Sequence, residues 1–328
     1  MSKCSDALLA LVAIAAPFAL PPAAQAEGAA TVAAAEAAPR LTVAELRAKY
    51  QDARSRYMTI RGMEVHYKDE GKGPVLFMVH GSQSSLRTWD RITMLLKNRY
   101  RIVRYDIPGF GLSGAVTDEA AASVQPTEVA EELLTRLGVT KATVVGVSSG
   151  GTMGMYLAAR RPDMVERLIL SNTPSDPVDT SHMVQPQSFL DAQARATRTH
   201  YQDQTFWNEY LSYFAGDSTR ISARTRAEYY DFNRRAVEKY PIAMVARIGD
   251  GKQATIEMAK VRAPVLLAWG TGDPLLPESA ANAITRYLAN ARISRLMMPD
   301  VGHYPPLEVP DRIARLIVDY VEVVVPKP

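Results

Sequence analysis

The chain has 328 residues and a mass of 36.0 kDa, which is enough for one large α/β domain or two small ones. Lys and Arg number 38 against 35 Asp and Glu, for a net charge of +3. This balance provides no concentrated basic face, so we expect no nucleic-acid partner. The single cysteine, Cys4, excludes an internal disulfide, and no two of the five histidines have metal-ligand spacing. We therefore expect no metal and no cofactor.

Residues 1–26 have the layout of a secretory signal peptide. Lys3 gives a positive start, residues 7–20 form an apolar run of 14 residues, and Ala24-Gln25-Ala26 is an A-x-A cleavage signal. The run is shorter than the roughly 20 apolar residues that a membrane span needs. We predict export to the periplasm or the exterior, cleavage near Ala26, no stable membrane span, and a flexible linker over residues 27–40.

Strand and helix patterns then alternate along the chain. A short helix is expected within residues 41–57. Apolar or alternating runs predict strands at 57–60, 63–68, 74–79, 101–107, 142–147, 168–171, 264–269 and 293–298. Amphipathic stretches predict helices at 127–137, 152–161, 278–288 and 311–324. This alternation predicts the α/β class, with a mostly parallel, doubly wound sheet in a core made of residues 41–174 and 263–328.

Residues 175–262 interrupt the alternation with a helical pattern. They hold 11 of the 25 aromatic residues, and we predict a helical cap over the carboxyl ends of the strands. We expect most of these rings to fill the core of the cap and a minority to line an apolar substrate pocket. The cap arginines alternate with Asp and Glu, which favours a solvated helix face over a carboxylate-binding site; they are Arg195, Arg198, Arg224, Arg226, Arg234 and Arg235.

The sequence Gly146-Val147-Ser148-Ser149-Gly150 fits G-x-S-x-G between a predicted strand and a predicted helix. The glycines permit a tight turn with Ser148 at its tip. A hydroxyl needs a base, and His303 lies in the loop after the last predicted strand. Asp273, after the penultimate strand, can orient the imidazole. We predict Ser148, Asp273 and His303 as the catalytic residues.

The segment His80-Gly81-Ser82 follows the predicted strand at 74–79. We predict that the backbone N–H groups of Ser82 and Ser149 stabilise an oxyanion. His80 precedes the serine in the chain, which is the wrong order for the base, so we assign it a structural role.

A second glycine motif, Gly109-x-Gly111-x-x-Gly114, formally matches a dinucleotide fingerprint. It follows the fourth predicted strand and does not open a βαβ unit. We therefore expect no nicotinamide cofactor.

Over roughly residues 58–325 the chain resembles a serine hydrolase of the α/β-hydrolase fold with a helical cap. The motifs that carry the resemblance are His80-Gly81, residues 106–113 (DIPGFGLS), the turn at Ser148, Gly272-Asp273 and Gly302-His303. The resemblance implies a Ser-Asp-His triad and an acyl-enzyme. Dehalogenases and epoxide hydrolases of this fold use an aspartate at the turn, so a serine disfavours both. Some members place the acid after the sixth strand, which makes Asp176 the second candidate.

These features predict an exported serine hydrolase of a small carboxylic ester with an apolar or aromatic character. A carbon–carbon bond hydrolase, thioesterase, lactonase or amidase would use the same triad. The export signal counts against the carbon–carbon bond hydrolases, which normally work inside the cell. From another class, the fold can also serve as a ligand-binding receptor with little turnover. The sequence defines neither the acyl chain length nor the oligomeric state.

Overall fold

The structure is a computed structural model that describes residues 39–175, 178–236, 238–240, 242–248 and 251–322. The predicted signal peptide and residues 27–38 of the predicted linker lie outside the described residues. A single eight-stranded sheet has the order β1-β2-β4-β3-β5-β6-β7-β8. Its strands are β1 Arg56–Ile60, β2 Met63–Glu70, β3 Val75–Val79, β4 Arg101–Tyr105, β5 Ala142–Val147, β6 Val165–Ser171, β7 Val265–Gly270 and β8 Ile293–Met298.

Only the first two strand pairs of the sheet, β1 with β2 and β2 with β4, are antiparallel. From β4 to β8 all neighbours run parallel. The mostly parallel α/β sheet that the sequence predicts is therefore confirmed. Parallel neighbours place their carboxyl ends at the same edge, so the loops that follow β3, β5, β6, β7 and β8 gather there.

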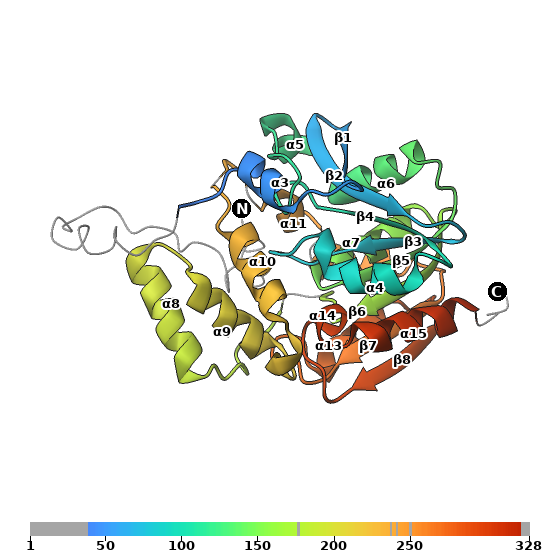
Figure 1. Cartoon of the computed structure of the whole chain (residues 1–328). Helices are drawn as coiled ribbons and strands as arrows, with labels where there is room; N and C mark the ends of the chain where they lie inside the picture. Colours follow the sequence, from blue (N-terminus) through green and yellow to red (C-terminus); the bar gives the residue numbers. More distant parts are fainter. Residues whose placement is uncertain (1–38, 176–177, 237, 241, 249–250, 323–328) are drawn as a thin grey trace.

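Helices cover both faces of the sheet (Figure 1). One layer contains α6 (Pro126–Arg136), α7 (Ser149–Arg160) and α13 (Glu278–Tyr287), and the other contains α4 (Asp90–Leu96) and α15 (Pro310–Glu322). Successive strand residues point to opposite faces. On β5, Val144 belongs to the core on the α7 side and Val145 to the core on the α15 side, which explains why the buried strands are apolar along their whole length.

Three short elements follow β3 and β4 without a counterpart in the predicted pattern. They are the 3-10 helix η1 (Leu86–Trp89), helix α4 and helix α5 (Asp118–Ser123). Ser85 caps η1 and Thr117 caps α5 through their side-chain oxygens. Because these elements have between four and seven residues, they are too short to produce a periodic apolar signal.

The segment predicted as a cap is helical. It contains α8 (Gln187–Thr199), α9 (Gln204–Phe214), η2 (Ser218–Arg220), α10 (Ala223–Asn233), α11 (Ala243–Ala246) and α12 (Gly251–Met258). Helices α8, α9 and α10 form the cap beside the sheet in Figure 1. Phe189, Phe206 and Trp207 are buried and contact one another or Tyr210 through their rings. Helix α12, in contrast, packs against α7 of the core.

The described chain begins with a segment that joins the cap to the core. The backbone of Leu41 pairs with residues 234–236, at the end of α10. Helix α3 (Val43–Tyr50) follows, and its Leu46 packs in a small apolar cluster with Phe232 of α10. The hydroxyl of Tyr50 donates a hydrogen bond of 2.5 Å to the buried carboxylate of Asp231. This segment therefore fixes one end of the cap.

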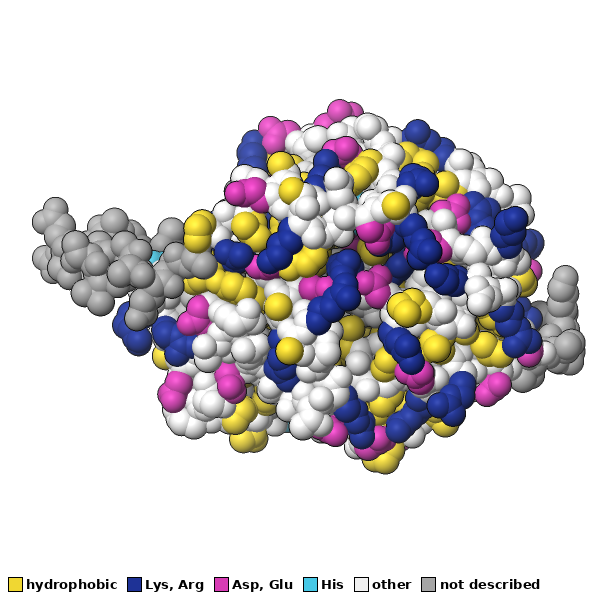
Figure 2. All heavy atoms as spheres, in the orientation of Figure 1, with side chains coloured by type: hydrophobic (Ala, Val, Ile, Leu, Met, Phe, Trp, Pro, Cys, Tyr) yellow, Lys and Arg dark blue, Asp and Glu magenta, His cyan; other side chains and the backbone are white. Residues whose placement is uncertain are grey.

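On the face drawn in Figure 2, Lys and Arg side chains are interspersed with Asp and Glu. This distribution agrees with the small net charge of +3. Within the residues that the structure describes, no helix combines the length and the hydrophobicity that crossing a bilayer requires.

Candidate active site

Ser148 lies at the tip of the turn between β5 and α7 with φ 53° and ψ −134°. The residues two positions before and after it must be glycines for steric reasons. A Cβ on Gly146 would lie 2.5 Å from the Cα of Gly151, and one on Gly150 would lie 2.4 Å from the carbonyl oxygen of Val79. Both distances are below van der Waals contact, so the close approach of β3, β5 and α7 permits no side chain there. The side chain of Ser148 thus projects above the carboxyl edge of the sheet.

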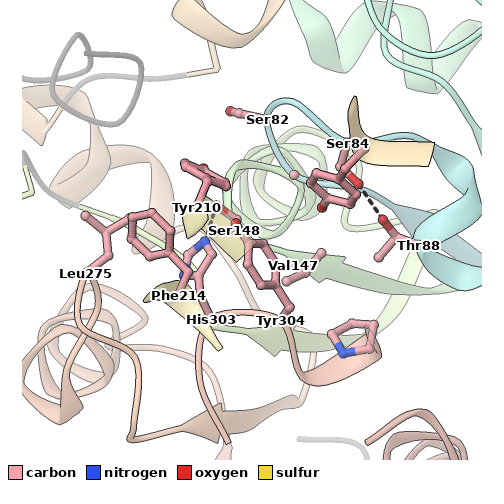
Figure 3. A pocket seen from close by; sticks show the side chains of 13 residues that line it. Ser82, Ser84, Thr88, Val147, Ser148, Tyr210, Phe214, Leu275, His303 and Tyr304 are labelled. Carbon is pink, nitrogen blue, oxygen red and sulfur yellow. Dashed lines mark hydrogen bonds between the residues drawn. The ribbon is translucent and has the colours of Figure 1, made fainter. Parts of the chain in front are cut away.

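Asp273, His303 and Ser148 form a continuous hydrogen-bonded line, and Figure 3 shows its His303 and Ser148 side chains. The Nδ1 of His303 lies 2.6 Å from Oδ2 of Asp273, and its Nε2 lies 3.2 Å from Oγ of Ser148. The carboxylate can only accept, so it selects the tautomer with a proton on Nδ1. Nε2 is then free to accept the serine proton. The three residues, which are far apart in the sequence, meet because each follows a parallel strand.

Asn172, which the sequence analysis missed, holds Asp273 in place. It follows β6, is fully buried, and donates from Nδ2 to Oδ2 of Asp273 at 2.8 Å. The same amide group donates to the carbonyl of Gly270 at 2.8 Å and accepts from its N–H at 2.9 Å. The N–H of Leu275 donates to the other carboxylate oxygen at 2.8 Å. A polar residue directly after a buried parallel strand was the available signal for Asn172.

The two residues that are predicted to supply oxyanion donors lie next to each other. The hydroxyl oxygens of Ser82 and Ser149 are 3.0 Å apart, and within the described part of the chain neither backbone N–H donates to a protein acceptor. A Cβ on Gly81 would lie 2.9 Å from the Cβ of Ser148. The loop after β3 therefore passes directly beside the serine, and the oxyanion role of the Ser82 and Ser149 N–H groups stays a prediction.

His80 fixes that loop. Its Nδ1 lies 2.6 Å from the carbonyl oxygen of Gly81, and its Nε2 accepts from the N–H of Ile107 at 3.0 Å. Burial lowers the pKa of His80, which favours the neutral ring that these two bonds require. His80 therefore has a structural role.

Glu308 is a buried carboxylate that joins the His303 loop to the cap. It accepts from the N–H groups of Gly302 at 3.0 Å, Gly216 at 2.9 Å, and Asp217 and Tyr304 at 3.3 Å. Burial raises the pKa of Glu308, while the hydrogen bonds from the backbone oppose the shift. Gly216 and Asp217 follow α9 of the cap, and Gly302 and Tyr304 lie on either side of His303. The Glu308 side chain therefore binds both the end of α9 and the His303 loop.

The triad opens into a cleft of about 510 Å³, a volume that includes space open to solvent. Burial raises the pKa of Tyr210 to about 12 and that of Tyr304 well above its usual value, so both phenols stay protonated near neutral pH. The lining combines hydroxyl-bearing and apolar side chains; its residues are Gly81, Ser82, Ser84, Thr88, Val147, Ser148, Tyr210, Phe214, Tyr229, Leu275, His303, Tyr304 and Pro306.

The other sequence candidates lie apart from this cleft or cannot be located. The glycine motif at 109–114 encloses the buried carboxylate of Asp106, which accepts from the N–H groups of Leu86 and Leu112 at 2.7 and 2.8 Å. A Cβ on Gly111 would lie 2.3 Å from that carboxylate, so the glycine serves local packing.

Asp176, the second candidate for the acid of the triad, lies outside the described residues. Among the residues that are described, no group of three or more His, Cys, Asp or Glu is placed to hold a metal ion.

The cap arginines do not form one solvated face. Arg195 pairs with Asp203 at 2.8 Å on the surface. Arg235, however, is only 8% exposed and donates to the carbonyl of Gly111 at 3.2 Å. The prediction is therefore wrong for Arg235, because its guanidinium bridges the end of α10 to the core loop instead of facing water.

The parallel sheet, the serine at a strand–helix turn and the loops at its carboxyl edge define an α/β hydrolase fold. The chain belongs to the α/β hydrolase fold family, whose model matches residues 74–310. It is 26% identical over 285 residues to haloalkane dehalogenase 2 of Mycobacterium tuberculosis, with 81% of this chain and 94% of the relative covered. It is 29% identical over 261 residues to the pimeloyl-[acyl-carrier protein] methyl ester esterase of Nitrosomonas europaea, with 76% and 96% covered.

Among solved structures, the fold is similar to that of 2-hydroxy-6-oxo-6-phenylhexa-2,4-dienoate hydrolase from Rhodococcus sp. strain RHA1. The TM-score is 0.68 at 16% identity, with 82% of this chain and 98% of that chain covered. These relatives are hydrolases, which supports an enzymatic function. Because they act on different bonds, membership of the family defines the fold and does not define the substrate.

Proposed function

We propose that this protein is a serine hydrolase that cleaves a small carboxylic ester through an acyl-enzyme. The observation that carries the proposal is the line of hydrogen bonds from Asp273 through His303 to Ser148, at 2.6 and 3.2 Å. A hydroxyl becomes an effective nucleophile when an oriented base accepts its proton. All three side chains are buried, and Ser148 and His303 line the cleft, so water competes weakly for these bonds.

The reaction follows from this arrangement. His303 Nε2 takes the proton of Ser148 as Oγ attacks the ester carbonyl, and the N–H groups of Ser82 and Ser149 stabilise the oxyanion. The bond to the alcohol then breaks, and the imidazolium gives its proton to the leaving oxygen. Water attacks the acyl-enzyme while His303 accepts its proton, and that proton returns to Ser148 as the acid departs. Asp273 stabilises the imidazolium throughout.

The serine at position 148 argues against dehalogenation, although one relative is a haloalkane dehalogenase. A carboxylate that displaces a halide forms an ester, and water can hydrolyse that ester at its carbonyl. A serine that displaces a halide would form an ether, which has no carbonyl to attack. Acyl transfer is therefore the chemistry that Ser148 supports, and the relative that cleaves a methyl ester agrees with it.

The direct test is Ser148→Ala, assayed on a small aryl ester. We expect kcat to fall by at least about a thousandfold, with an unchanged circular dichroism spectrum. Ser123→Ala is the matched control, because Ser123 is exposed on α5 and its hydroxyl donates to the carbonyl of Glu119 within the same helix. Turnover by Ser148→Ala at the rate of the control would reject the proposal.

A panel of leaving groups and a covalent probe distinguish the alternatives. Esters, thioesters, lactones, amides and dienoic ketones of similar size would be compared by kcat/KM, and the ester is expected to be the best substrate. A fluorophosphonate that labels Ser148 without measurable turnover of any substrate would instead indicate a ligand-binding receptor.

We also propose that the protein is exported and cleaved near Ala26. The proposal is supported by the apolar run of 14 residues and the A-x-A signal at positions 24–26. Intact mass of the protein recovered from the periplasm or the medium would give a chain that starts at Glu27. An uncut chain found only in the cytoplasm would contradict it.

A further inference from the structure

The two walls of the cleft differ in chemistry. Beside His303 the wall includes the apolar side chains of Phe214 and Leu275, with the rings of Tyr210 and Tyr304 against Phe214. On the other side of Ser148 the wall carries hydroxyls, with Ser84 and Thr88 shown there in Figure 3. A uniformly apolar pocket would suit a plain alkyl chain, whereas this cleft changes from apolar to polar across the nucleophile.

Three hydroxyls make up the polar wall. Ser84 Oγ and Thr88 Oγ1 are 2.5 Å apart, and Tyr229 lines the cleft together with them. Each hydroxyl has one donor and two acceptor sites, so the bond between Ser84 and Thr88 leaves both donors and lone pairs of the three hydroxyls unused. An alkyl chain against these groups would desolvate them without replacing their hydrogen bonds, whereas a substrate hydroxyl could satisfy donors and lone pairs and a substrate oxo group could accept from the donors.

A second cavity lies behind this wall and strengthens the case for a polar occupant. It has a volume of about 320 Å³, again counting space open to solvent, and Ser84, Thr88 and Tyr229 line it as well. Two of its lining residues have buried polar atoms without a partner in the described structure, namely Gln83 Oε1 and Arg87 Nε. The three hydroxyl-bearing side chains therefore lie between the cleft and the second cavity, and Gln83 and Arg87 lie beyond them.

The charge balance of this region selects a neutral group. Arg87 is the cation near the polar wall, and it already pairs with Glu228 at 2.6 Å and with Asp90 at 3.6 Å. A substrate carboxylate would have to compete with both side chains and would meet the negative charge of Glu228. A hydroxyl or an oxo group faces no such repulsion.

The mechanism decides which half of the ester meets which wall. His303 protonates the leaving oxygen, so the leaving group must lie on its side, against Phe214 and Leu275. The acyl group then points to the other side of Ser148. We propose that the cleft takes an acyl group with a neutral hydroxyl or oxo substituent, bound by Ser84, Thr88 and Tyr229, and an apolar leaving group. This inference rests on the proposed ester hydrolysis.

The experiment compares phenyl butyrate with phenyl 3-hydroxybutyrate and phenyl 3-oxobutyrate, which share one leaving group. We expect kcat/KM to be at least about tenfold higher for an oxygenated ester, because a site that hydrogen-bonds a substituent discriminates against the analogue without it. Thr88→Val and Tyr229→Phe should bring this ratio close to one. Tyr201→Phe is the matched control, since it deletes a cap hydroxyl that bonds Tyr230 at 2.8 Å outside the cleft, and it should preserve the ratio.

The outcomes separate the two proposals. Equal turnover of all three esters by the natural enzyme would overturn the inference and leave the ester hydrolase intact. A preference that both cleft variants retain would overturn the assignment to these hydroxyls. Turnover of none of the esters would count against the proposed function itself, and the inference would fall with it.

Discussion

Replacing Glu308 with Gln tests whether one carboxylate joins the cap to the catalytic loop. The glutamine amide can take two orientations. With its oxygen in the place of Oε2, its NH₂ group faces the N–H groups of Gly302 and Tyr304. With its oxygen in the place of Oε1, its NH₂ group faces the N–H groups of Gly216 and Asp217. In the first orientation two buried donors meet a donor, and in the second the two donors are only partly buried. A buried group without a partner costs about 1–3 kcal/mol and a partly buried one less, so we expect the free energy of unfolding to fall by about 2–3 kcal/mol.

The assay is urea unfolding followed by tryptophan fluorescence, together with kcat for a small aryl ester. Because Gly302 immediately precedes His303, we expect kcat to fall at least about tenfold as the imidazole loses its alignment. Glu278→Gln is the matched control, since Glu278 is an exposed residue that pairs with Arg295 at 3.4 Å, and its loss should cost less than about 1 kcal/mol. A Glu308→Gln enzyme within about 1 kcal/mol of the natural protein, with full kcat, would refute this reasoning.

Three further substitutions test other contacts. Asn172→Ala removes the amide that donates a hydrogen bond to Asp273. Because a hydrogen bond to a charged group is worth about 1.5–3 kcal/mol, kcat should fall about 10- to 150-fold with little change in KM. Two arginines lower the pKa of Asp300 to about 2, so Asp300→Asn should be less stable than the natural protein at pH 7, and the difference should vanish as the pH falls from about 4 to about 2. Tyr50→Phe removes a bond to Asp231 and should lower the free energy of unfolding by about 1–2 kcal/mol without changing kcat. Unfolding curves and steady-state kinetics check all three.

The sequence predicted the sheet and the location of the triad because both depend on local patterns. Strands buried on both faces are continuous apolar runs, and a residue that directly follows such a run must lie at the carboxyl edge of the sheet. Ser148 directly follows β5, and Asp273 and His303 lie in the loops that follow β7 and β8. The glycines around Ser148 added a steric requirement that can be recognised without coordinates.

The residues that support the triad could not be predicted in this way. Glu308 binds the N–H of Gly216, 92 positions away in the chain, and a backbone N–H carries no signal in the amino-acid sequence. The polar wall is equally non-local, since Thr88 belongs to η1 and Tyr229 to α10 of the cap. We predicted an apolar pocket from the number of aromatic rings in the cap. The amino-acid sequence does not show where the hydroxyls of its tyrosines lie.

Two of the contacts, or joints, that attach the cap lie close to the cleft, and their positions explain how a separate helical layer can define its walls. At one joint Glu308 binds the backbone just beyond Phe214, and at the other Asp231 of α10 binds the N-terminal segment. Phe214 and Tyr229 line opposite walls, and each lies within three residues of a joint. Substitutions at the Asp231 joint should therefore alter the shape of the acyl wall and hence KM. Glu308 also binds the backbone on both sides of His303. Substitutions of Glu308 should therefore change both KM and kcat, whereas substitutions at Asp231 should change KM.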